Sequence, residues 1–400
     1  MDLLCLGAAF AAIVVLIALK RPLYQALLGG VAVIAVLFGM SAPVVLQQFA
    51  DVFSKWSSFS VVVSMYLITM LARILDDRGQ IKLAQKDLNG LFHNRRINAT
   101  AAPLVIGLLP SAAAMLLCAD IVKDASDDYL KPREQAFITS WIRHIPESSL
   151  PTYSGVLLMA SISGVEMGSY MLGMIIPVIL LILLAWFPFI HRLPKDPGTP
   201  KSENRLADAV NLTKHLWTLL ALMVLIMVLG MNVVPALVVV LAAAVVIYRY
   251  SVKDALRLLI RAFDKKLILS TFMVLVLKEF ITHTGVLETL PDVLSALPIP
   301  AYLVFALMFF LGGMISGASS IIALGAPMAV AAMGSSMPLI VLLMSMAHAA
   351  SQVSPVHVCL VVAAESHGVS LGELVKQTLP RALVFCVLSI VYYNVLVWIL

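Results

Sequence analysis

The sequence predicts an all-α polytopic membrane protein made of two inverted repeats, each with five crossings, one re-entrant hairpin and one broken helix. Of its 400 residues, 61% are hydrophobic and 12% are charged, against about 45–50% and about 25% in soluble globular domains. Uncharged runs such as 170–190 are long enough to cross a hydrocarbon core of about 30 Å. The second half of the chain also repeats the first.

The long apolar runs give the expected crossings, five in each half. They are 3–19, 22–40, 59–75, 134–166 and 169–190, followed by 214–231, 233–249, 266–281, 337–366 and 380–400. The basic residues lie mainly in the short connections between these runs, where they orient a membrane protein. The net charge of +5 therefore indicates a lipid bilayer and no nucleic acid as the partner.

Two further apolar runs, 99–121 and 300–334, are interrupted by Gly, Pro and Ser residues around Gly107 and Gly313. Helix-breaking residues at membrane depth free backbone N–H and C=O groups. They are tolerated where the backbone is buried in protein or lines a wet cavity. These two runs therefore predict re-entrant hairpins.

The repeat is an ordered series of matches along the whole chain, which is typical of internal duplication. The segment 41–53 matches 251–263 without a gap, and further pairs are Gly79 with Gly285, Gly107 with Gly313, His144 with His348, Pro151 with Pro355, and Gly164 with Gly368. The numbering offset drifts only between 204 (His144 to His348) and 210 (Ser41 to Ser251). Because each half has an odd number of crossings, the second half must enter the membrane inverted.

The distribution of Lys and Arg agrees with this topology. The basic clusters in 20–21, 78–96, 123–133, 192–205 and 249–266 all fall on one side, and no Lys or Arg occurs between Lys278 and Lys376. The positive-inside rule then places both termini outside. The hairpin of the first half should open from the cytoplasm and that of the second half from outside.

These elements define the expected domain organisation. The first repeat is 1–190, with scaffold helices in 1–75 and the hairpin and broken helix in 97–190. A polar, Pro-rich linker at 191–213 leads to the second repeat, 214–400, with its scaffold in 214–281 and its hairpin and broken helix in 300–400. The segment 78–93 has the pattern of an amphipathic helix lying in the membrane interface.

A polar cluster interrupts the crossing 134–166 and provides the first candidate site residues: Arg143, His144, Glu147, Ser148 and Ser149. Pro146 and Pro151 should break the helix there, and inverted-repeat transporters usually bind solute and coupling ions at such breaks. The second copy has His348, Ser351, Gln352 and Ser354 at the corresponding place. Arg143 indicates an anionic solute, although a structural ion pair between Arg143 and Glu147 is the alternative.

The histidines and the hairpin serines complete the candidate set. His144, Glu147 and His348 are candidates for proton coupling, because histidine titrates near physiological pH. Ser111, Ser316 and Ser319 near the hairpin tips are candidate solute ligands, unless these small residues only permit close helix packing. Cys5, Cys118, Cys359 and Cys386 are isolated and show no metal-ligand spacing, so neither a metal site nor a cofactor is expected.

The layout of three helices, hairpin, broken helix and helix, duplicated and inverted, resembles the ion transporter superfamily. That superfamily includes sodium-coupled dicarboxylate symporters, citrate and gluconate transporters, and the large subunits of TRAP transporters. Within it, the segment Trp141–Gly155, with its Arg-His, Glu, Pro, Tyr and Gly series, is similar to a bacterial and archaeal integral membrane family without an assigned function. The Ser-Asn-Thr motif of the sodium-coupled members is replaced here by Glu147-Ser148-Ser149 and Ser351-Gln352-Val353.

The resemblance implies a secondary active transporter in the cytoplasmic (inner) membrane of a bacterium or archaeon, working by an elevator mechanism and forming a homodimer through its scaffold. It implies no enzyme activity. The departure from the Ser-Asn-Thr motif leaves the coupling ion and the solute open. The alternatives are a channel or a non-transporting membrane protein, and an intramembrane hydrolase that uses a serine with His144 or His348. No Gly-x-Ser-x-Gly sequence accompanies these histidines.

Overall fold

The computed structural model describes residues 2–19, 21–108, 113–196, 204–286, 298–354 and 357–400. All regular secondary structure in the described part is helical: it consists of α-helices and one short 3-10 helix, with no β-strand. The all-helical fold class is therefore confirmed.

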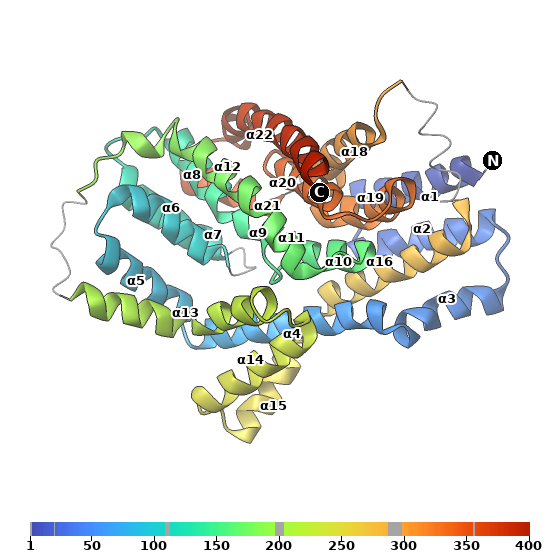
Figure 1. Ribbon diagram of the computed structural model, residues 1–400, viewed down its shortest axis with the longest axis horizontal. Helices are drawn as coiled ribbons and strands as arrows, with labels where there is room; N and C mark the ends of the chain where they lie inside the picture. Colours follow the sequence, from blue (N-terminus) through green and yellow to red (C-terminus); the bar gives the residue numbers. More distant parts are fainter. Residues whose placement is uncertain (1, 20, 109–112, 197–203, 287–297, 355–356) are drawn as a thin grey trace.

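The first half of the chain forms twelve described α-helices and one 3-10 helix (Figure 1). Its helices are α1 (Asp2–Ala18), α2 (Leu23–Leu37), α3 (Ala42–Ser54), α4 (Trp56–Asp77), α5 (Gln80–Phe92), α6 (Arg95–Ile106), α7 (Ala113–Ser126), α8 (Pro132–Arg143), α9 (Ile145–Ser149), α10 (Ser154–Ser163), α11 (Met167–Gly173), α12 (Ile175–Trp186) and the 3-10 helix η1 (Ile190–Arg192). Helix α5 corresponds to the amphipathic segment expected at 78–93.

The described part of the second half is also helical. Its helices are α13 (Arg205–Met227), α14 (Val233–Ile247), α15 (Val252–Arg261), α16 (Lys265–His283), α18 (Ala301–Ser316), α19 (Ala318–Met333), α20 (Met337–Ser351), α21 (Val358–Ser366) and α22 (Leu371–Ile399). Helix α13 begins inside the segment expected to be a linker. Its start is fixed by Asn204, whose side chain accepts a hydrogen bond from the Ala207 N–H, so the polar sequence 205–213 forms its first turns.

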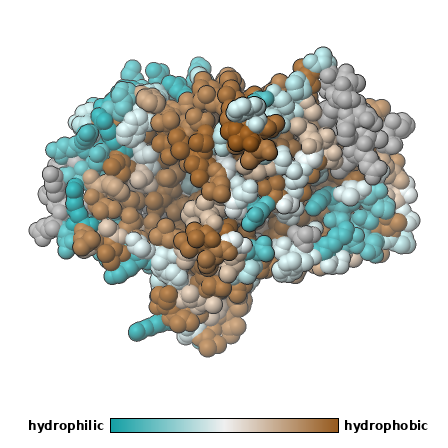
Figure 2. All heavy atoms as spheres, viewed as in Figure 1, coloured by the Kyte–Doolittle hydropathy of each residue, from teal (hydrophilic) through white to brown (hydrophobic). Residues whose placement is uncertain are grey.

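Four helical segments of the described part are long and apolar enough to cross a membrane. They are Ser58–Asp77, Met167–Trp186, Arg205–Met227 and Leu371–Ile399. Shorter apolar helices, such as Leu23–Leu37 and Val233–Ile247, accompany them. Figure 2 shows apolar residues across the middle of one face and over the projecting helices α14 and α15, with hydrophilic residues toward the two ends.

The helices make two sets of contacts, which also meet each other where α10 packs on α4, α11 on α13 and α19 on α16. In the first, α1 packs on α2, α13 on α14, α2 and α3 on α16, and α14 and α15 on α4. In the second, the hairpins α6/α7 and α18/α19 enclose the short helices α8, α9, α10, α20 and α21, with α12 and α22 beside them. Helices α9 and α10 lie near the middle of the molecule in Figure 1. The residues at the interrupted ends, such as Arg143, His144 and Gln352, are buried.

Candidate functional site

The first interruption lies between α8 and α10. Helix α8 ends at Arg143, His144 joins it to the one-turn helix α9, and residues 150–153 are not helical. Pro146 supplies part of the cause, because proline has no N–H to continue the hydrogen bonds of α8 and disfavours helical geometry in the preceding residue. Pro151 acts in the same way after α9. The break frees backbone groups between Arg143 and Tyr153 from the regular hydrogen bonding of a helix.

The second interruption lies between α20 and α21. Helix α20 ends at Ser351 and α21 begins at Val358. The sequence Gln352 to Ser354 and His357 form the described part of this break. The two breaks face each other, since α9 and α10 pack on α20, and α21 packs on α8.

Buried side chains bind the backbone carbonyl groups near both breaks. The Tyr170 hydroxyl donates to the Ser148 carbonyl, and the Tyr153 hydroxyl donates to the carbonyl of Gly107 at the end of α6. The Ser354 hydroxyl donates to the Met314 carbonyl in α18 at 2.7 Å. Carbonyl groups without partners in a water-free interior cost several kcal/mol each, roughly. These bonds stabilise the broken helices and tie each one to a hairpin.

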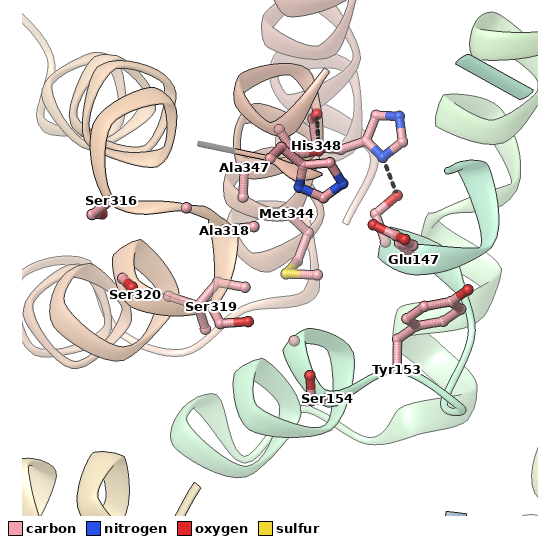
Figure 3. A pocket seen from close by; sticks show the side chains of 16 residues that line it. Glu147, Tyr153, Ser154, Ser316, Ala318, Ser319, Ser320, Met344, Ala347 and His348 are labelled. Carbon is pink, nitrogen blue, oxygen red and sulfur yellow. Dashed lines mark hydrogen bonds between the residues drawn. The ribbon is translucent and has the colours of Figure 1, made fainter. Parts of the chain in front are cut away.

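A cavity of about 290 Å³ lies between the tip of hairpin α18/α19 and the two breaks. Ten of the sixteen residues that line it are polar: Glu147, Ser148, Tyr153, Ser154, Ser316, Ser319, Ser320, His348, Ser351 and His357. Figure 3 shows the hairpin serines on one side and Glu147 and Tyr153 on the other, with His348 and Met344 between them. The cavity is large enough for a small polar molecule.

Gly317 forms the hairpin tip at this cavity, between α18 and α19. Its backbone angles, φ 86° and ψ 157°, lie in a region that essentially only glycine occupies. The turn lets Ser316 end one helix while Ala318 begins the next, and both residues line the cavity. Gly317, one of the glycines that interrupt this apolar run, therefore forms a tight turn at the cavity wall.

Arg143 and Glu147 form an ion pair beside the cavity. The Arg143 Nη1 atom lies 2.5 Å from Glu147 Oε1, and the two side chains are 1% and 23% exposed. Glu147 lines the cavity, whereas Arg143 lies behind it. The carboxylate of Glu147 therefore lies between the Arg143 guanidinium and the cavity.

A chain of hydrogen-bonding side chains connects the two halves of the molecule. Ser148 Oγ lies 3.0 Å from His348 Nδ1, and His348 Nε2 lies 3.3 Å from Gln352 Nε2. The Ser140 hydroxyl donates to Gln352 Oε1 at 3.4 Å. The imidazole of His348 is thus held between α9 and its own helix, next to the cavity.

His144 occupies a second position in this buried network. Its Nδ1 atom lies 2.5 Å from the Ser140 carbonyl oxygen, and its Nε2 atom lies 2.9 Å from His357 Nε2. A carbonyl oxygen can only accept, so the Nδ1 atom of His144 carries a hydrogen and donates. In the neutral ring the Nε2 lone pair then points toward His357.

The structure brings part of the expected site together. Glu147, Ser148, Ser316, Ser319 and His348 line the cavity. Arg143, His144, Ser149, Gln352 and Ser354 are buried nearby but are absent from its lining. Ser149 donates to the Ile145 carbonyl at 2.9 Å within α9. Ser111 lies outside the described residues.

Sequence reasoning missed His357 and Ser154, and it cited Tyr153 only within the family resemblance. His357 stands two residues after Pro355, as Tyr153 stands two residues after Pro151. The repeat alignment therefore places Tyr153 and His357 at matching positions, and both line the cavity. Extending that alignment beyond identical residues would have identified His357.

The fold and the site together define a helical protein with membrane-length apolar helices and an interior polar cavity bounded by interrupted helices. Residues 3–396 match the family described as "Protein of unknown function (DUF401)", and the chain belongs to this family. The sequence-based expectation of a family without an assigned function is therefore confirmed. No curated protein matches the chain.

Proposed function

We propose that this protein is a secondary active transporter for a small, anionic solute. The observation that carries this proposal is the meeting of a hairpin tip and two interrupted helices, from opposite halves of the chain, around one interior polar cavity. Transporters built from inverted repeats bind solute in such a place, where free helix ends and polar side chains replace water.

The packing of the hairpins supports an internal repeat. Hairpin α6/α7 packs on α8 of its own half and on α21 of the other half. Hairpin α18/α19 packs on α20 of its own half and on α10 of the other half. The contacts of α2 and α3 with α16 likewise correspond to those of α14 and α15 with α4. A twofold-related arrangement of two similar units explains this crossed pattern.

The turn geometry supports the repeat independently. Gly79 and Gly285 have φ values of 58° and 67°, and Gly164 and Gly368 have φ values of 71° and 66°. Gly39 and Arg249 also form such a pair, at 63° and 50°. Positive φ is uncommon, particularly for a residue such as arginine. Its recurrence at the offsets of the sequence repeat favours duplication of the whole unit.

The ion pair supports proton coupling to an anion. In the observed state Glu147 neutralises Arg143. If Glu147 takes up a proton from the cavity, its negative charge is lost, and an anionic solute can neutralise the guanidinium in its place. Solute and proton would then bind together and leave together. His348 and His144, with imidazole nitrogens in the same network, would relay the proton.

The two sets of helix contacts support an elevator mechanism. Helices α6–α12 and α18–α22 would form the moving transport domain, and α1–α4 with α13–α16 would form the scaffold and the homodimer interface. Movement of the first group across the second would carry the cavity from one face of a bacterial or archaeal inner membrane to the other. The apolar middle and hydrophilic ends seen in Figure 2 agree with this placement.

One contact favours a second candidate function, hydrolysis. Ser148 Oγ and His348 Nδ1 are 3.0 Å apart in the cavity, as a nucleophile and its base would be. However, the other nitrogen of His348 faces the amide of Gln352, where a hydrolase would place a carboxylate to orient the base and stabilise its charge. The geometry therefore supports transport better.

Uptake by purified protein in proteoliposomes tests the proposal. A thermal-shift screen of organic anions at two pH values first identifies a solute that stabilises the protein. We expect saturable uptake of this solute that is driven by an inward proton gradient and stops when the gradient is collapsed. Uptake that rises linearly with concentration would indicate a channel. Turnover of an ester or amide that stops in Ser148→Ala would indicate a hydrolase.

A further inference from the structure

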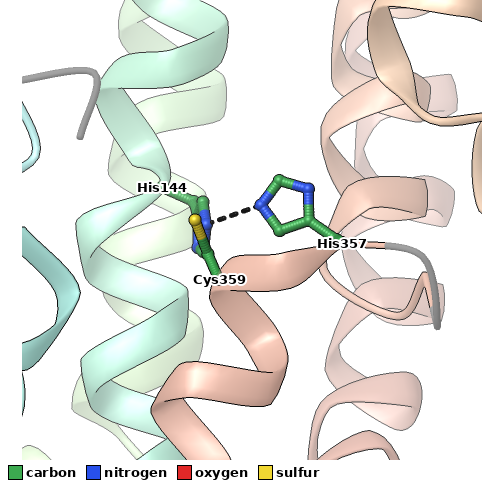
Figure 4. Close-up of side chains that lie close together, drawn as sticks. All are labelled: His144, His357 and Cys359. Atoms are coloured by element: carbon green, nitrogen blue, oxygen red, sulfur yellow. Dashed lines mark hydrogen bonds between the residues drawn. The ribbon is translucent and has the colours of Figure 1, made fainter. Parts of the chain in front are cut away.

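His144, His357 and Cys359 form a compact group of metal-binding side chains that the sequence spacing does not reveal. Their potential ligand atoms all lie within 4.8 Å of one another. His144 follows α8, whereas His357 and Cys359 lie at the start of α21. Figure 4 shows the three side chains converging between these helices. We propose that this group binds one divalent transition-metal ion, and that zinc fits it best.

The ligand chemistry selects the class of ion. Imidazole nitrogen and thiolate sulfur are the protein ligands that zinc prefers, usually in a tetrahedral arrangement. Harder ions such as magnesium and calcium require oxygen ligands. The Nε2 atoms of His144 and His357 are 2.9 Å apart, so a small outward movement of either ring would admit an ion between them.

The surroundings of His144 match those of a metal ligand. Metal-bound histidines nearly always donate their second ring N–H to a carbonyl or carboxylate, which fixes the ring and its tautomer. The His144 Nδ1–H donates to the Ser140 carbonyl at 2.5 Å. Its Nε2 lone pair is consequently directed at His357 and Cys359, where the ion would lie.

Metal binding requires the Cys359 thiolate, which burial disfavours and the nearby Arg143 guanidinium favours. The Arg143 Nη1 atom lies 4.0 Å from Cys359 Sγ, and a nearby guanidinium stabilises a thiolate. Binding exchanges the thiol proton, released to solvent, for the divalent ion, so the site gains one positive charge. The carboxylate of Glu147, whose Oε1 atom lies 3.8 Å from His144 Nε2, can offset this gain.

The group also has an entry path. His357 and Glu147 line the cavity, so an ion in the cavity reaches the group without crossing packed apolar side chains. Three protein ligands with a fourth position open to exchange are typical of zinc sites that meet a solute or substrate. This inference goes beyond the proposed transport function and does not depend on it. In the metal-bound state His348 alone would relay the proton, because the ion occupies the Nε2 atom of His144.

Cobalt(II) titration of the purified, metal-free protein in detergent tests the site, because cobalt replaces zinc and reports its ligands by absorption. We expect one cobalt per chain, visible bands of a tetrahedral ion, and a near-ultraviolet sulfur-to-cobalt charge-transfer band. Zinc should displace the cobalt. Cys359→Ser should abolish the charge-transfer band. His357→Gln removes a ligand, so it should weaken binding by more than the roughly 10- to 100-fold that follows from losing a group that only supports a ligand.

Cys386→Ser is the matched control, because Cys386 is also half-buried but lies outside the group. This variant should keep the full cobalt spectrum. Thermal unfolding without metal shows that each variant is folded. Failure of the wild-type protein to bind cobalt or zinc, or an unchanged charge-transfer band in Cys359→Ser, would overturn the proposal. Neither result would affect the transport proposal, since no solute is present.

Discussion

Arg143 is almost fully enclosed, with 1% of its side chain exposed, so its charge must be balanced inside the protein. Glu147 balances it one helical turn further along the chain. The sequence predicted this pair from the spacing of four residues, and it left open whether the pair is structural or part of the site. The structure shows the contact itself, and it places Glu147 at the cavity wall.

Glu147→Gln should destabilise the protein, because it leaves the Arg143 charge buried without its partner. The expected loss in the free energy of unfolding is about 3–5 kcal/mol, whereas removing both charges can be nearly neutral. Thermal unfolding of the detergent-solubilised variants measures this. Arg143→Gln/Glu147→Gln should recover stability but remain inactive in uptake. A double variant with full uptake would show that Arg143 has no role in binding.

Arg143→Lys should give a folded protein with weak solute binding. Lysine keeps the charge that Glu147 requires, but an ammonium cannot make the planar two-point contact of a guanidinium with a carboxylate or phosphate. Concentration-dependent uptake should therefore show a raised KM for the anion, with unfolding close to that of the wild type. Equal KM values in the two proteins would contradict direct recognition by the guanidinium.

The sequence predicted where the helices break, but it did not identify every candidate site residue around the breaks. Glu147, Ser148 and His348 were identifiable because they are polar residues within apolar runs. The repeat alignment could have pointed to His357, but not to its grouping with Cys359 and His144, because His144 is more than 200 residues away and becomes a neighbour only after folding. Contacts between segments distant in sequence are set by packing, which the local pattern does not encode.

At the scale of the elements, closely packed glycines hold each hairpin against its broken helix. A Cβ atom on Gly107 would overlap the Arg143 carbonyl oxygen, and one on Gly313 would meet the Ala350 Cβ at 2.8 Å. The two glycines occupy matching places in the sequence repeat, and each faces the last turn of the helix before a break. The sequence indicated both glycines as hairpin features, but the close contact with the broken helix is visible only in the structure.

Gly107→Ala and Gly313→Ala should each lower the free energy of unfolding by about 1–3 kcal/mol, because the added methyl group forces the hairpin away from its partner helix. Gly7→Ala is the control, since nothing lies within 4 Å of a Cβ there, and alanine favours a helix over glycine. Thermal unfolding in detergent compares the three variants. Equal stability in all three would contradict the close packing.

Helix ends were predictable where capping or proline residues mark them, and less so where polar residues continue a helix. Pro146 and Pro151 marked the first break correctly. The start of α13 was missed because the polar residues after Asn204 resemble a linker, although the Asn204 cap and Asp208 in the first turn favour a helix.

At the scale of the whole molecule, the topology is still a prediction. Lys253, at the start of α15, and Thr282, at the end of α16, are both exposed and lie at opposite ends of the segment that contains α16. In a variant without native cysteines, Thr282→Cys should react with an impermeant thiol reagent added to intact cells. Lys253→Cys should react only after the cells are permeabilised. Labelling of both from the same side would contradict the inverted arrangement.

The hydrogen bonds between the breaks also constrain how the protein is made. Ser148 with His348, Ser140 with Gln352, and His144 with His357 each join residues from different halves of the chain. While the first half is already in the bilayer and the second is still on the ribosome, these groups lack their partners. The first half should therefore stay near the insertion machinery, or be recognised by quality-control proteases, until synthesis is complete. A gene split between Asp196 and Asn204 should accumulate both fragments when they are co-expressed, and either fragment alone should be degraded, as immunoblots of membranes would show.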